Sequence, residues 1–421
     1  MTDIIDSEVG IRPGDELDGL RRARPNAREQ SQAAYDALFP PETSDGFALA
    51  DRLAVADFTV RLFGVPVETY AARLATKDAA LGAAVAEAAS GALALGPFGH
   101  FPPSELSAED TDGLRWTPSG EDALTIGARL AAGLAHAHLL ALRPRESSRE
   151  ALEALIAAGW SVDEIVTLSQ LVTFVSYQVR VIHALRVLGG RAGAVDAGGR
   201  ATIAPAPGAA AREVTAPEVP MAFTQDQLWW EPWLPPIEQD ALTPEQLHGM
   251  VEAPRAALPY FRLLARDPGI LRARTLADLD IFTNDDGGLP RAERELAAAV
   301  ASRLNGCLFC ASVHARVSTK FSGRRDDVQR LLDDGIGARI DDRWDALIAG
   351  AAALTATPVA FASRDVERLR ELGLGEQAIF DLASAAAFFN WANRLMLSLG
   401  EPRVDAAKLA VIRDYEASKR G

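Results

Sequence analysis

This 421-residue chain repeats part of its own sequence. Residues 67–77, VETYAARLATK, match residues 310–320, CASVHARVSTK, at an offset of 243. Residues 174–180, FVSYQVR, match residues 388–394, FFNWANR, at an offset of 214. Self-similarity at a fixed offset indicates two copies of one structural unit. The two offsets differ by 29 residues, so the first copy carries an insertion of about that length.

Both copies have the pattern of helices. Apolar residues recur at three- and four-residue spacing, and no segment alternates convincingly as a strand does. The fold class predicted is therefore all-α, with two tandem helical domains. The insertion falls at 91–120, which has the Gly, Pro and Ser content of a long loop. The predicted parts are an N-terminal arm (1–45), a first domain (46–190), an Ala/Gly/Pro linker (191–222) and a second domain with a Trp-rich arm (223–421).

Both cysteines of the chain lie in the second copy, around a predicted helix break. A helix is predicted from Leu289 to Leu304, and Asn305-Gly306 is typical of a left-handed helix end. A second helix then begins at or near Cys307. Cys307, Cys310 and His314 are spaced three and four residues apart, so they share one face of that helix.

The spacing of residues along the two helices predicts that a glutamate lies close to this group. Glu295 lies ten residues before Asn305, and His314 lies eight residues after Gly306. At about 1.5 Å per residue these distances are roughly 15 and 12 Å, so two helices folded back on each other bring Glu295 and His314 level. Cys307 also lies at a helix N-terminus, where the dipole favours thiolate.

Three readings of the CxxC pair are open. It could be half of a zinc site, but His314 is the one obvious third ligand and four are usual. The cysteines could be inert core residues, although two unrelated cysteines rarely fall at this spacing. A dithiol redox centre is favoured, because one thiolate can reduce a peroxide while the other resolves the sulfenic acid.

The pattern E-x11-C-x-x-C-x3-H on a helical hairpin resembles the carboxymuconolactone decarboxylase superfamily, and within it the alkylhydroperoxidase D-like, peroxidase-related branch. The segment FFNWANRL, 388–395, is similar to that family as well. The resemblance implies that Cys310 attacks the peroxide, that Cys307 resolves it, and that Glu295 and His314 relay the proton. Alkylhydroperoxidase D itself has a histidine directly before the second cysteine, where this chain has Phe309.

The resemblance also sets expectations for the assembly and the substrates. It implies reduction of alkyl or hydrogen peroxides through a CxxC disulfide, with re-reduction by a small dithiol protein or a dihydrolipoyl adaptor. It implies no metal, haem or flavin cofactor. Family members assemble as helical trimers or hexamers of single domains, so a fused pair suggests a homotrimer with six domains, with a dimer as the alternative.

The first copy lacks every member of the motif. At the repeat offset Arg52 stands opposite Glu295, Gly64 and Val67 opposite the cysteines, and Ala71 opposite His314. The first domain is therefore predicted to be a structural copy without redox chemistry. It either shapes the active site of the second domain or completes the assembly. The second of these roles is the favoured hypothesis.

Several further residues are candidates for the peroxide pocket. Phe309, Asn390 and Trp391 lie in the motif or in the family-like segment downstream. Trp229, Trp230 and Trp233 could form a ligand cage, although anchoring an arm on a neighbouring surface is the favoured role for them.

Composition narrows the range of possible partners and cellular locations. A formal net charge of −15 argues against nucleic acid or an anionic membrane as the main partner. No apolar run reaches roughly 18 residues, and no leader pattern opens the chain, so a cytoplasmic location is expected. Two other functions stay open: a disulfide reductase or redox sensor that uses the same CxxC, and a non-catalytic assembly protein.

Overall fold

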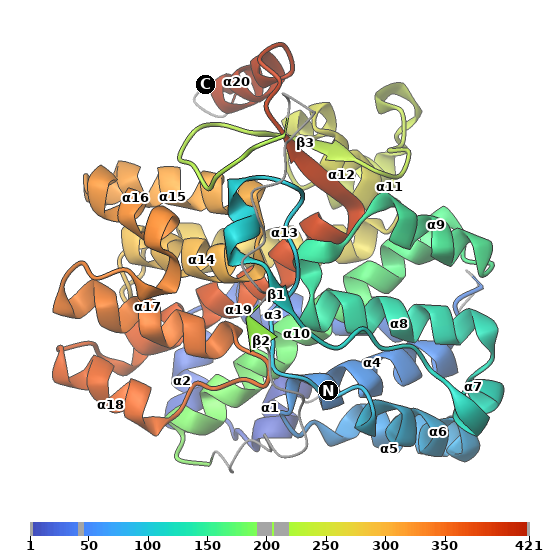
Figure 1. The fold of residues 1–421 in the computed structure, drawn as a ribbon. Helices are drawn as coiled ribbons and strands as arrows, with labels where there is room; N and C mark the ends of the chain where they lie inside the picture. The colour runs from blue at the N-terminus through green and yellow to red at the C-terminus, as the bar shows by residue number, and fades with distance from the viewer. Residues whose placement is uncertain (1–2, 41–45, 192–203, 206–218, 419–421) are drawn as a thin grey trace.

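The computed structural model describes residues 3–40, 46–191, 204–205 and 219–418. Most of the predicted linker, 191–222, lies outside these residues. The chain is all-α, as predicted (Figure 1). Its first half contains α1 (Ile4–Val9), α2 (Glu16–Arg22), α3 (Pro25–Leu38), α4 (Leu49–Phe63), α5 (Glu68–Lys77), α6 (Ala79–Ser90), α7 (Gly120–Ile126), α8 (Ala128–Leu142), α9 (Arg149–Ala157) and α10 (Val162–Leu188).

The second half contains ten further helices within the described residues. It contains α11 (Pro244–Gly249), α12 (Pro259–Leu264), α13 (Pro268–Thr283), α14 (Arg291–Asn305), α15 (Leu308–Ser322), α16 (Arg325–Asp334), α17 (Asp342–Thr355), α18 (Ser363–Glu371), α19 (Glu376–Leu399) and α20 (Leu409–Ser418). Two short antiparallel ribbons pair β1 (Thr111–Asp112) with β2 (Ala204–Pro205) and β3 (Trp229–Pro232) with β4 (Gly400–Arg403). The segment predicted as a loop, 91–120, contains one 3-10 helix at Glu105–Glu109 and the short strand β1, and α7 begins at its last residue.

The repeat begins earlier than the sequence predicts. The sequence assigns residues 1–45 to an N-terminal arm, but α3 lies within this range and matches α13 in order, with 14 and 16 residues respectively. Both helices begin at a proline, Pro25 and Pro268, which lie 243 residues apart. The two helices also pack against each other. The first copy therefore starts near Pro25, and α3 belongs to the repeat instead of the arm.

The register of the repeat also needs a one-residue correction. Arg52 donates to the carbonyl of Leu38 at the end of α3, 3.0 Å away. Arg294 donates in the same way to the carbonyl of Ile281 near the end of α13, 2.8 Å away. Each arginine lies twelve residues before a left-handed glycine that ends its helix. Arg52 is therefore the counterpart of Arg294, and the buried Leu53 stands opposite Glu295.

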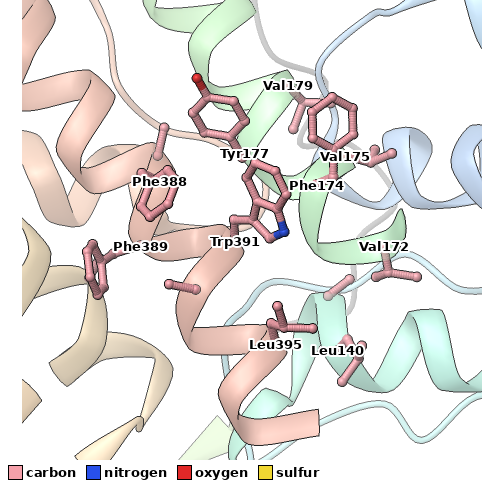
Figure 2. Packing of buried hydrophobic residues seen from close by; sticks show 14 of the residues in the cluster. Leu140, Val172, Phe174, Val175, Tyr177, Val179, Phe388, Phe389, Trp391 and Leu395 are labelled. Carbon is pink, nitrogen blue, oxygen red and sulfur yellow. The ribbon is translucent and has the colours of Figure 1, made fainter. Parts of the chain in front are cut away.

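The two halves meet across α10 and α19, which lie side by side at the centre of Figure 1. Figure 2 shows the rings at this contact: Phe174 and Tyr177 on α10 face Phe388 and Trp391 on α19. Phe174 packs edge-on against Trp391 at 5.2 Å, and Tyr177 packs edge-on against Phe388 at 6.1 Å. At the offset of 214, Phe174 corresponds to Phe388 and Tyr177 corresponds to Trp391. The contact is therefore nearly symmetric, since the two edge-on pairs join equivalent positions of the two helices.

Two buried arginines repeat this symmetry. Arg180 on α10 donates to the carbonyls of Leu354 and Thr355, at the C-terminal end of α17. Arg394 on α19 donates to the carbonyl of Ala141, at the C-terminal end of α8. Each guanidinium thus crosses to the other half and meets the negative end of a helix. The halves consequently share one core.

Helix α10 is long and apolar enough to cross a membrane by composition. Its apolar window is entirely buried inside the protein, since both halves pack around it. It is the central core helix of this fold, and its apolar character on all sides follows from that position.

Two buried histidines on α8 make the fold sensitive to acid. Burial lowers the pKa of His136 to about 4 and that of His138 to about 3. The unfolded chain takes up these protons near pH 6.5, while the folded chain stays neutral, so stability is complete above that pH and falls below it. Between pH 7.5 and 5 we expect each imidazole to cost about 2 kcal/mol of unfolding free energy.

Urea unfolding at the two pH values would measure this loss. In a His138→Asn variant the difference between the two pH values should shrink by about 2 kcal/mol, whatever the variant does to absolute stability. A pH dependence identical to that of the unchanged chain would contradict the assignment.

Candidate active site

The CxxC pair lies at the turn of the predicted helical hairpin. Helix α14 ends at Gly306, whose φ of 81° is left-handed, and α15 begins one residue after Cys307. A Cβ at Gly306 would also lie 2.8 Å from the Cβ of Arg145, so the position needs glycine for two reasons. The tight turn lets α14 and α15 pack along their length.

Glu295 and His314 meet between these two helices. The His314 Nδ1 lies 2.5 Å from Glu295 Oε2. Arg291 donates to the other carboxylate oxygen at 3.3 Å, and the glutamate side chain is only 3% exposed. A carboxylate at Nδ1 favours the tautomer with the proton on that nitrogen, which leaves Nε2 as the basic atom. The pair can therefore accept and return a proton.

The two thiols lie side by side and are both free. Their sulfur atoms are 2.9 Å apart, and Cys307 and Cys310 are 2% and 5% exposed. Burial raises the pKa of the Cys310 thiol well above its ordinary value, the neighbouring Cys307 raises it further, and the charge of Arg274 opposes both effects. A base is therefore needed to form the Cys310 thiolate at neutral pH.

Cys310 and His314 open into one cavity of about 260 Å³. Cys307 is not among the residues that line it. The walls are mostly apolar, with a few polar side chains among them. The lining residues are Gln227, Leu228, Trp229, Trp230, Leu258, Pro259, Tyr260, Phe261, Arg274, Asp278, Phe309, Cys310, Val313, His314, Arg316, Phe389, Ala392, Met396, Ile412 and Tyr415.

The Trp-rich arm covers this cavity. Strand β3 pairs with β4 along its whole length, and the Trp230 indole donates to the carbonyl of Met396 at 3.1 Å. Trp229 and Trp230 are both buried and line the cavity, whereas Trp233 does not line it. Trp229 and Trp230 thus combine the anchoring role expected for the tryptophans with a place in the cavity wall.

Of the three pocket residues predicted from the sequence, the cavity contains Phe309 alone. Asn390 and Trp391 are wrong as pocket residues. Helix α19 turns Phe389, Ala392 and Met396 toward the cavity, at spacings of three and four residues. Trp391 faces the other half instead, where its indole donates to Gln170 at 3.2 Å.

Asn390 is fully buried between helices of the core. Its amide nitrogen donates to the hydroxyl of Thr355 and to the carbonyl of Ala386. Its amide oxygen accepts from Asn305, at the end of α14. These hydrogen bonds give Asn390 a structural role, because they link α19 to the ends of α14 and α17.

Most polar cavity residues were not predicted, among them Tyr260, Arg274 and Asp278. Tyr260 lies on α12, and the other two lie one turn apart on α13. The two helices are separate because Asp267 caps a new helix whose first residue is Pro268. An arginine and an aspartate four residues apart look the same in sequence as a surface ion pair, so no sequence signal marks them as cavity residues.

The first half supports the hairpin from outside the cavity. The Arg145 guanidinium donates to the carbonyl of Leu304 at 2.6 Å, and Phe101, from the inserted loop, lies beside Gly306. All residues that line the cavity come from 227 onward. The first half therefore holds the turn without lining the cavity.

Within the described ranges, no group of three or more His, Cys, Asp or Glu side chains is placed to hold a metal ion.

Comparisons with known proteins find similarity within the second half of the chain. The carboxymuconolactone decarboxylase family matches residues 268–356, which span α13 to α17. An uncharacterized peroxidase-related protein from Silicibacter sp. TM1040 is 27% identical, over 35% of this chain and 75% of its own, with a TM-score of 0.32. The alkylhydroperoxidase AhpD core of an uncharacterized peroxidase-related protein from Ralstonia eutropha JMP134 is 28% identical, over 39% of this chain and 88% of its own, with a TM-score of 0.34. No curated protein matches the chain.

Proposed function

We propose, from the carboxymuconolactone decarboxylase family domain that residues 268–356 form, that this chain is a thiol-dependent peroxidase. One observation carries the proposal: Cys310 and His314 line one largely apolar cavity, while Cys307 touches Cys310 from outside it. A peroxide in the cavity would thus meet Cys310 first.

The chemistry proceeds in two balanced steps. His314, held by Glu295, takes the Cys310 proton, and the thiolate sulfur attacks the terminal peroxide oxygen. The O–O bond breaks, Cys310 becomes a sulfenic acid, and the alkoxide takes the proton back to leave as an alcohol. Cys307 then attacks the Cys310 sulfur, which forms the disulfide and releases water.

The burial of both thiols argues against the alternative function, in which the CxxC pair reduces disulfides of other proteins. At 2% and 5% exposure, neither sulfur can be reached by a disulfide on a folded partner protein without opening of the arm. A small peroxide needs no such opening. Re-reduction calls for a slender dithiol, such as a dihydrolipoyl arm, which can enter where a globular surface cannot.

Thiol titration combined with intact mass tests the proposal. The reduced chain is treated with one equivalent of tert-butyl hydroperoxide, alongside Cys310→Ser and Cys307→Ser. The unchanged chain should lose both thiols and the mass of two hydrogen atoms. Cys307→Ser should gain one oxygen atom at Cys310, and Cys310→Ser should not react. Thiols that stay reduced in the unchanged chain would overturn the proposal.

A further inference from the structure

The C-terminal helix α20 forms one wall of the cavity that contains Cys310. Ile412 and Tyr415 both line this cavity. They are three residues apart, so they lie on the same face of α20. Figure 1 shows α20 at the top of the view, next to the C-terminus and away from the central helices. The helix therefore covers the cavity from its outer side.

Helix α20 is held more weakly than the other helices of the cavity wall. None of its side chains that the structure describes is buried. By contrast, α12, α13, α15 and α19 each contain buried residues. A helix of this length is marginal in water by itself, and elements with few buried contacts open at a low free-energy cost. We therefore expect α20 to leave the cavity before the other walls do.

An ion pair joins the start of α20 to the tryptophan arm. The Lys408 Nζ lies 2.7 Å from Oε2 of Glu231, in β3, and 3.8 Å from Oδ2 of Asp405. Glu231 also accepts from the indole of Trp229, which lines the cavity. The side chains of Lys408 and Glu231 are 44% and 36% exposed. Dissolved salt therefore weakens this attraction.

The chain just before α20 is built as a hinge. Strand β4 is fixed by its pairing with β3, and this pairing ends at Arg403. Val404 follows and is 47% exposed. The carboxylate of Asp405 then accepts from the backbone N–H groups of Ala407 and Lys408, which forms a compact local turn. Rotation at Val404 would thus move this turn and α20 as one unit without breaking the β3–β4 ribbon.

We propose that α20 is a lid over the Cys310 cavity, hinged at Val404 and closed by the Lys408–Glu231 ion pair together with Ile412 and Tyr415. The lid opens for molecules larger than a small peroxide. Its role in the reaction cycle rests on the proposed peroxidase function: opening admits the dithiol that re-reduces the Cys307–Cys310 disulfide. That dithiol gives two electrons and two protons to the cysteine pair and leaves as a disulfide itself.

Labelling of Cys310 in the reduced full chain tests the lid without any peroxide. Fluorescein maleimide is too large for the cavity of about 260 Å³, whereas iodoacetamide is small. Peptide mass locates the label. Fluorescein maleimide should label Lys408→Met about 2–5-fold faster than the unchanged chain, and Ile412→Ser about tenfold faster, while iodoacetamide labels all three at similar rates. Lys77→Met is the matched control, because Lys77 is exposed at the end of α5 in the first half.

A salt series separates opening of the lid from a general loss of structure. Raising sodium chloride from about 0.05 to about 0.5 M should speed fluorescein maleimide labelling about 2–3-fold in the unchanged chain, but not in Lys408→Met. This measurement needs no variant for its first result, so it stands even where a variant folds poorly. Labelling rates that are independent of salt in the unchanged chain, or equal in the unchanged chain and both lid variants, would overturn the lid.

The role of the lid in re-reduction is tested with dihydrolipoamide on the disulfide form, prepared with diamide. Lys408→Met should be reduced faster by the same factor as it is labelled, while its oxidation by tert-butyl hydroperoxide stays within about twofold of the unchanged rate. Faster labelling without faster reduction would overturn the role in re-reduction. Faster labelling and reduction in a chain that tert-butyl hydroperoxide does not oxidise would support the lid and overturn the peroxidase function.

Discussion

Glu295→Gln is expected to slow the reaction of Cys310 with hydroperoxide by about 10²–10⁴-fold, the range typical of a lost general base. The carboxylate lies 2.5 Å from His314 Nδ1 and stabilises the imidazolium that forms when the ring takes a proton. The dependence on this base is strong because burial raises the pKa of the Cys310 thiol. A thiol that was already ionised would need little help.

The pH profile separates this role from a structural one. In His314→Gln the residual rate should rise about tenfold per pH unit, because solvent hydroxide replaces the lost base. Glu295→Gln keeps the imidazole without the carboxylate that stabilises its protonated form, so its rate should also rise with pH, but less steeply. The unchanged chain should show a flatter profile around neutral pH. Stopped-flow tryptophan fluorescence or quenched intact mass would follow the single turnover.

Glu293→Gln is the matched control for Glu295→Gln. Glu293 lies two residues earlier on α14, is also buried, and forms a two-pronged ion pair with Arg343 at 2.7 Å. Its loss should lower stability but leave the rate of Cys310 oxidation within a few-fold. An equal loss of rate in both variants would contradict the relay.

The hairpin and its four motif residues could be predicted because their geometry is local. The Asn305-Gly306 break fixes where the chain turns, and helical rise alone then brings Glu295 level with His314. Such an argument needs only sequence distances. It correctly anticipates which residues meet, although their roles follow from chemistry and resemblance.

The cavity could not be predicted, because its walls come from segments distant in sequence. Tyr260, Trp229 and Tyr415 line the same cavity as Cys310 through tertiary packing that no local pattern records. Helix α19 adds a second difficulty. This helix is buried on nearly all sides, so its apolar residues are not confined to one face. The sequence pattern therefore does not distinguish the side that faces the cavity from the side that faces the core. That is why Trp391 was assigned to the wrong face.

The repeat was visible in the sequence, but its register and its first helix were not. One ungapped offset of 243 fits α3 and α13 yet is one residue out in α4 and α14, where Arg52 corresponds to Arg294. Connections of different length absorb such shifts without disturbing the packing of the helices. The contacts of the two arginines and the left-handed glycines that end α4 and α14 reveal the correction.

A buried ion pair joins the start of the first copy to α19 in the second. The Arg24 guanidinium binds Asp381 through two bonds, Nε to Oδ1 at 3.1 Å and Nη2 to Oδ2 at 2.7 Å. The side chains are 2% and 1% exposed. Arg24 also donates to the carbonyls of Asp286 and Gly287, in the loop that leads into α14.

Arg24→Met is therefore expected to lower the free energy of unfolding by about 3–5 kcal/mol, as removal of one partner of a buried pair does. The variant leaves the Asp381 carboxylate buried, with the backbone N–H of Leu289 and the amide of Gln377 as its remaining donors. Urea unfolding measures the change. Arg368→Met is the control, since Arg368 pairs with Glu371 at the exposed surface and should cost at most about 1 kcal/mol.

A double variant distinguishes the ion pair from simple loss of packing. Arg24→Met with Asp381→Asn removes both charges and keeps an acceptor for Leu289, so no buried charge is left without a partner. The double variant should then be more stable than the sum of the two single losses predicts, by about 1–3 kcal/mol. Additive losses, or a loss below about 1 kcal/mol in Arg24→Met, would show that the two halves are held together by the α10–α19 contact and do not depend on this pair.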